Sequence, residues 1–72
     1  MQLDYSGNEL DSLEASVDSR LGGRVRHLQV LLRGDGIILK GHAHSYYVKQ
    51  LAQHAVMQTS AYPIVANEIE VI

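Results

Sequence analysis

The sequence predicts an α+β domain in which two helices pack on one face of a three-stranded sheet, in the order α-β-β-α-β. Three observations carry this prediction. Two segments repeat apolar residues at helical spacing, two alternate apolar and polar residues around a glycine-rich turn, and one further alternating segment follows the single proline. The chain has 72 residues and no visible linker, which indicates a single domain near the lower size limit for a stable core. We assign residues 1–7 to an N-terminal tail and 8–72 to the domain.

Each predicted helix has a start signal and one apolar side. Asn8 is an N-cap candidate for a helix that runs to about Arg20 and that Gly22-Gly23 ends, because glycine readily adopts the left-handed conformation at a helix C-terminus. Ser45 is the N-cap candidate for a helix that runs to about Thr59. The apolar side of the first helix is Leu10, Leu13, Val17 and Leu21. That of the second is Val48, Leu51, Ala52, Ala55 and Val56.

Between the helices the alternation predicts a β-hairpin. A two-residue turn at Asp35-Gly36 is a strong hairpin signal and fixes the register. The inner pairs are then Leu32–Leu39, Val30–Gly41 and Leu28–Ala43. The outer pairs are Arg33–Ile38, Leu31–Lys40, Gln29–His42 and His27–His44. A slip of one residue would mix the two faces. The strand order stays open: either the first or the second strand can be central.

The last predicted strand opens at Tyr62-Pro63, since proline is tolerated at a strand's first position. Its inward face is Val65, Asn67, Ile69 and Val71. An inward amide must satisfy its hydrogen bonds, so we expect Asn67 to bind the backbone of a neighbouring loop. Gly41 also faces the packed side, where we expect that a side chain would collide with a helix.

Two stretches resemble a known family. "DGIILKGHAHSYYVKQLAQHAV" (35–56) has a turn glycine, an apolar-x-Leu-x-Gly strand, a small polar residue opening a helix, and alanines within it. "IVANEIEV" (64–71) is similar to a closing V-x-N-x-I-x-V strand. Both resemble the BON domain (bacterial OsmY and nodulation domain), although Tyr62-Pro63 stands where that family usually has a glycine. The resemblance implies a non-catalytic module, often attached to periplasmic or envelope proteins and proposed to bind phospholipid.

Composition argues against several function classes. The chain has no cysteine, which excludes disulfides, thiolate nucleophiles and Cys-type zinc sites. No serine lies on a glycine-flanked elbow, and no glycine loop is arranged to hold phosphate. The net charge of −2 and the absence of a GXXG clamp argue against nucleic acid as a partner. The start of the chain lacks signal-peptide features, and apolar runs reach only three residues, too short for a membrane span. We therefore expect neither an enzyme nor a cofactor.

Charge is distributed unevenly along the chain. Five of the eight acids precede Arg20, whereas all six bases lie from Arg20 to Lys49. Either the charges complement the dipole of the first helix, or the bases form a surface that recruits anions. The residues of the predicted lipid- or anion-binding surface are Arg24, Arg26, Tyr46, Tyr47 and Lys49. The two tyrosines either anchor in a headgroup layer, or one of them packs on the core.

The uncovered sheet face offers two further candidates. Leu31, Arg33, Ile38 and Lys40 there predict an interface for a second copy or a partner, such as an envelope protein. The edge of the last strand is a second place for such a partner, by strand addition. His27, His42 and His44 lie together under the predicted register and are either a weak metal-site candidate or three solvated side chains. The leading functional prediction is a binding module for anionic phospholipid or an envelope component, and the alternative is a protein-interaction or self-association module.

Overall fold

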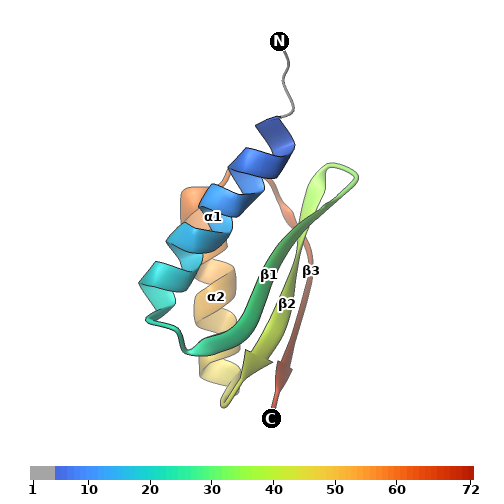
Figure 1. Cartoon of the computed structure of the whole chain (residues 1–72). Coiled ribbons are helices and arrows are strands. Elements are labelled where there is room, and N and C mark those ends of the chain that lie inside the picture. The colour runs from blue at the N-terminus through green and yellow to red at the C-terminus, as the bar shows by residue number, and fades with distance from the viewer. Residues whose placement is uncertain (1–4) are drawn as a thin grey trace.

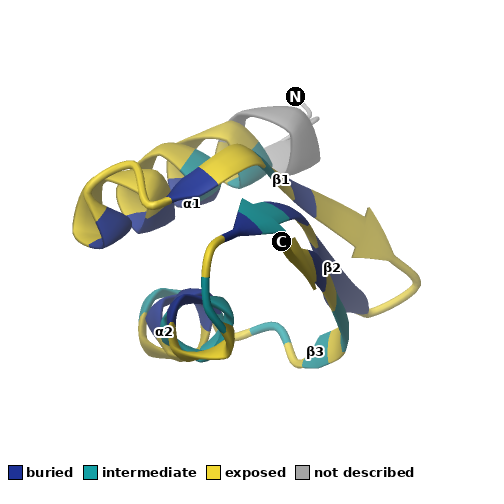
Figure 2. Ribbon diagram, turned by 90° about the horizontal axis from the view of Figure 1, so that it is seen from below, coloured by how far each residue is buried: buried dark blue, intermediate teal, exposed yellow. Residues whose placement is uncertain are grey.

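The structure, a computed structural model, describes residues 5–72 and confirms the predicted fold class (Figure 1). Its elements follow the predicted order: α1 (Tyr5–Leu21), β1 (Val25–Arg33), β2 (Gly36–Ala43), α2 (Tyr46–Thr59) and β3 (Ile64–Val71). Both helices lie on the same side of the sheet, α1 over β1 and α2 mainly over β3, and they also pack against each other (Figure 1 and Figure 2). Within residues 5–72, no helix lies on the other side of the sheet.

The strand order is β1-β2-β3, so β2 is central. β1 pairs with β2 in the antiparallel direction, as a short hairpin requires. β2 and β3 pair in the parallel direction because α2 carries the chain back along the sheet between them. The sheet is therefore mixed, and the open question of the central strand is answered in favour of β2.

The first helix starts earlier than predicted. α1 begins at Tyr5, so Asn8 lies within the helix and is not its N-cap, and residues 5–7 belong to the helix. Residues 1–4 of the predicted tail lie outside the described part of the chain. The helix ends as predicted: Gly22 and Gly23 have φ of +63° and +75°, and their amides donate to the carbonyls of Ser19 and Asp18.

The second helix confirms its predicted start and end. Ser45 is the N-cap in extended conformation, and its hydroxyl accepts a hydrogen bond from the Val48 amide at 3.2 Å. Along the helix, the predicted apolar side faces the core. Its buried residues are Val48, Ala52, Ala55 and Val56, and Leu51 packs partly against them.

The predicted hairpin turn is wrong by one residue. Arg33 pairs with Gly36, so the two-residue turn is Gly34-Asp35, with Gly34 at φ +61°. Gly36 is therefore the first residue of β2, and a Cβ there would overlap the Val65 side chain. From Gln29 to the turn the register therefore differs from the predicted one by two residues, and Val30 pairs with Leu39. Within this stretch a shift of two leaves the side chains on their predicted faces, since strand side chains alternate with a period of two. Leu32, predicted to face inward, is nevertheless 38% exposed.

Nearer the start of β1, a bulge between Arg26 and Gln29 interrupts this register. His27 within it has φ of +57°, an uncommon conformation for a residue other than glycine. The bulge brings Val25 inward opposite Ala43, where Leu28 was predicted. It lies against Gly41, where an added Cβ would be 2.8 Å from Val25 Cγ1 and 3.0 Å from the Arg26 carbonyl oxygen. We had predicted that a side chain at Gly41 would collide with a helix. The atoms that exclude it belong instead to β1.

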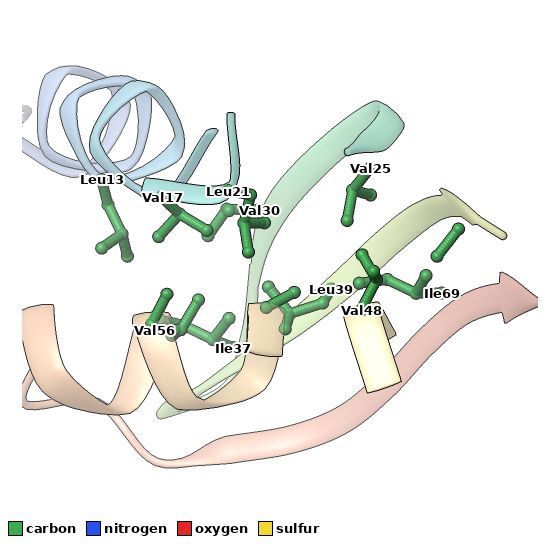
Figure 3. Close-up of a cluster of buried hydrophobic side chains, with 13 residues drawn as sticks. Leu13, Val17, Leu21, Val25, Val30, Ile37, Leu39, Val48, Val56 and Ile69 are labelled. Atoms are coloured by element: carbon green, nitrogen blue, oxygen red, sulfur yellow. The ribbon is translucent and has the colours of Figure 1, made fainter. Parts of the chain in front are cut away.

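The core is entirely aliphatic and lies between the helices and the sheet (Figure 3). Residues from all five elements contribute to it, and the most completely buried large side chains are Ile37, Leu39, Ile69, Val17 and Val56. The predicted α1 stripe is confirmed, with Leu13, Val17 and Leu21 buried and Leu10 packed alongside. On β3, Val65 was predicted to face inward but is 57% exposed. A register shift between Ile37 and Ile38 lets Ile64 pack against the core in its place.

Side chains occupy a backbone amide on each outer strand. The Glu14 carboxylate of α1 accepts a hydrogen bond from the Val30 amide of β1 at 2.9 Å. The Asn67 carbonyl oxygen accepts from the Ile69 amide of β3 at 3.2 Å. The Asn67 amide group donates to the Lys49 carbonyl oxygen at 3.1 Å, so it binds a helix and not the loop that we had expected. Occupied amides make an edge strand a poorer template for strand addition.

Candidate functional site

Strand pairing gathers most of the predicted lipid-binding residues at one end of the domain. Ala43 pairs with Val25 on one side and with Val71 on the other, and its carbonyl oxygen accepts from the Ile72 amide at 2.8 Å. α2 begins at Tyr46, only three residues after Ala43. The start of β1, the start of α2 and the end of β3 therefore lie together, at the bottom of Figure 1.

Apolar side chains at this end are strongly exposed. Tyr46 is 64% and Tyr47 67% exposed, so the alternative that one ring packs on the core is wrong. Val71 and Ile72, at the end of β3, are exposed as well. We call this surface the tyrosine end, and its residues are Arg24, Arg26, Tyr46, Tyr47, Val71 and Ile72. Of its apolar side chains, the two tyrosines were predicted to bind lipid, whereas Val71 was predicted to face the core.

The bases at the tyrosine end have different surroundings. Arg24 donates from Nε to the Leu21 carbonyl oxygen at 2.8 Å, which places its charge at the C-terminus of α1 and fits the helix-dipole explanation. Arg26 pairs with His42 and lines a small hollow with His27, His42 and Ile72. Lys49 lies one turn further along α2 and is half-buried. Four of the five predicted residues thus share one end, and Lys49 lies beside it.

The predicted sheet-face interface is smaller than expected. Ile38, although it lies on the helix-free side, is only 2% exposed, so it offers no free surface to a partner. Lys40 forms a salt bridge with Glu68 across the β2–β3 pair, with Nζ 3.8 Å from Oε1. Leu31 is 40% exposed and Arg33 is exposed, and these two remain accessible.

Two of the three predicted histidines come together. The rings of His27 and His42 have centroids 5.8 Å apart and are nearly perpendicular. His44 follows the end of β2 and is exposed, and among residues 5–72 no group of three or more metal-ligating side chains is close enough to hold an ion. Glu70, which sequence reasoning missed, lies with Oε1 3.5 Å from His42 Nε2. Only the parallel pairing of β3 with β2 reveals this neighbour, and the sequence left that pairing open.

Comparison with known proteins adds no further constraint: no family model, curated protein or solved structure matches the chain. Neither helix in the described part of the chain has the length and apolar character needed to cross a membrane.

Proposed function

We propose that this domain is a non-catalytic binding module that docks on anionic phospholipid surfaces through the tyrosine end. One observation carries the proposal: two exposed tyrosines, two exposed aliphatic residues and two arginines lie at the same end of the domain. The resemblance of 35–56 and 64–71 to the BON domain points to the same class of ligand.

The chemistry of the tyrosine end suits a membrane interface. Tyrosine has an apolar ring and a polar hydroxyl, which favours the headgroup level of a bilayer. A base close to an anionic bilayer contributes about 1 kcal/mol. Two arginines and a nearby lysine therefore give weak, reversible binding, and because the attraction is screened over roughly 10 Å at 0.1 M salt, that binding weakens as salt rises.

Co-sedimentation with liposomes tests the electrostatic part. We expect the protein to pellet with vesicles of phosphatidylglycerol and phosphatidylcholine at low salt, and to stay in solution with phosphatidylcholine alone. Arg26→Glu should abolish most of the binding. Arg33→Glu is the matched control: it makes the same charge change on the same strand, at the hairpin end, and should leave binding nearly unchanged.

A second pair of variants tests the apolar part. Replacing Tyr46 and Tyr47 with serine should reduce binding to anionic vesicles, whereas Met57→Ser, which removes an exposed apolar side chain further along α2, should not. If anionic vesicles bind no wild-type protein at low salt, the lipid proposal is rejected.

The alternative function, protein interaction or self-association through the sheet face or an edge strand, has less support. Ile38 is already buried within the chain, and a side chain occupies an amide on each outer strand. An apparent mass above that of a monomer in light scattering, combined with no lipid binding, would favour this alternative.

A further inference from the structure

We propose that His27 and His42 together chelate a transition-metal ion such as Zn²⁺ or Ni²⁺ on the helix-free face of the sheet. This inference does not rest on the proposed lipid binding, because it concerns a different set of side chains. The rings come from neighbouring strands, β1 and β2, which are held in register by the hydrogen bonds of the sheet.

The separation of the two rings suits a shared ion. Two imidazoles bound to one tetrahedral zinc, at Zn–N distances of about 2.0–2.1 Å, have ring centroids about 5–6 Å apart. The centroids of His27 and His42 are 5.8 Å apart. Both rings are accessible to solvent, so they can turn their nitrogens toward the same ion.

The backbone at His27 has an unusual conformation. The β1 bulge holds His27 at φ +57°, a conformation that is uncommon for a residue other than glycine. Bulges re-aim side chains, and here the His27 ring stands nearly perpendicular to that of His42. A regular hairpin of the same register would also place His27 opposite His42, so the bulge changes the orientation of the His27 ring and is not the cause of its closeness to His42.

One neighbouring carboxylate is placed to support a bound cation. His42 Nε2 lies 3.5 Å from Glu70 Oε1, so this carboxylate is placed to receive the ring N–H while Nδ1 takes the ion. Lys40, Glu68 and Glu70 also line the hollow beside the two rings, and Arg26 lines a second hollow with the same histidines, so these four charges sum to zero when the histidines are neutral. Since the described residues hold no three-ligand group, water must complete the coordination, and we expect a weak and exchangeable site.

Titration of the full chain with zinc chloride and with nickel chloride, followed by calorimetry and by NMR of the imidazole nitrogens, tests the proposal. We expect one ion per chain, with shifts at His27 and His42. His27→Asn and His42→Gln should each weaken binding at least about tenfold, since ligand loss should exceed the effect of removing a supporting carboxylate. Asparagine is chosen at residue 27 because it also tolerates positive φ.

His44→Gln and His54→Gln are the matched controls, since each removes an exposed imidazole that lies outside the pair. Both should bind as the wild type does. Glu70→Gln should weaken binding by up to about tenfold. The proposal is overturned if neither metal binds, if His27→Asn or His42→Gln retains wild-type affinity, or if His44→Gln or His54→Gln loses as much as they do. Circular dichroism of each variant separates loss of the site from loss of the fold.

Discussion

Gly41 is the residue whose replacement by alanine tests the description of the β1 bulge most directly. It has φ of +150°, a region that residues with a side chain rarely adopt. The new methyl group would also lie 2.8 Å from Val25 Cγ1 and 3.0 Å from the Arg26 carbonyl oxygen. The variant therefore combines backbone strain with overpacking between two hydrogen-bonded strands.

Both contributions can be estimated. An unfavourable backbone conformation costs on the order of 1–3 kcal/mol, and overpacking in a well-packed region costs about 1–3 kcal/mol. Because the bulge can move slightly, we expect Gly41→Ala to lower the free energy of unfolding by about 2–4 kcal/mol. A core of this size supplies only roughly 3–5 kcal/mol, so the variant should be partly unfolded at room temperature.

Urea denaturation followed by far-ultraviolet circular dichroism measures this loss, with Gly22→Ala as the control. Gly22 also has positive φ, +63°, but an added Cβ there meets no atom within 4 Å. Gly22→Ala should therefore cost only the backbone term, about 1–2 kcal/mol. If Gly41→Ala costs no more than Gly22→Ala, the close contact between Gly41 and the bulge is refuted.

Three further predictions concern hydrogen bonds of single side chains. Ser45→Ala should lower the free energy of unfolding by about 1 kcal/mol, because the Val48 amide loses its acceptor, and Ser45→Asp should restore most of it in urea denaturation. Glu14→Ala should speed hydrogen exchange at the Val30 amide and cost about 1 kcal/mol, whereas Glu14→Gln keeps an acceptor and should stay close to wild type in the same NMR experiment. Asn67→Asp should cost about 1–3 kcal/mol by thermal denaturation, since it sets a carboxylate oxygen against the Lys49 carbonyl oxygen; an unchanged midpoint would contradict that contact.

The order of the elements and the faces of the strands were predictable from local signals. Ser45 marks a helix start because its hydroxyl accepts a hydrogen bond from an amide only three residues away. Gly22-Gly23 mark a helix end because residues without a side chain adopt positive φ and bond back to the last turn. The two-residue error in the hairpin did not matter for the faces, since alternation repeats every two residues. Asn8 misled because a good capping residue also occurs inside helices, and no competing signal marks Tyr5 as the start.

What the sequence left open depends on contacts between distant segments. The parallel pairing of β3 with β2 brings Glu70 to His42 and Glu68 to Lys40, and no local pattern specifies it. The near-complete burial of Ile38 on the helix-free face likewise follows from the packing of the assembled sheet and not from its place in the alternation. Both proposed surfaces therefore needed the structure: their arginines, tyrosines and histidines were nominated from the sequence, but Glu70, Val71 and Ile72 were not.

The bulge in β1 connects stability with both proposed surfaces. By adding residues to β1 opposite Gly41, it reverses the alternation, so that Val25 rather than a polar neighbour closes the core beside Ala43. The same reversal places Arg26 beside His42, next to the exposed end of β3, and turns the His27 ring toward His42. A regular hairpin of the same register would keep His27 opposite His42 but would pair Arg26 with Ala43, on the face that packs against the helices. The bulge requires positive φ at His27 and a glycine at residue 41. It also closes the core with Val25 and sets the positions of Arg26 at the tyrosine end and of the His27 ring beside His42.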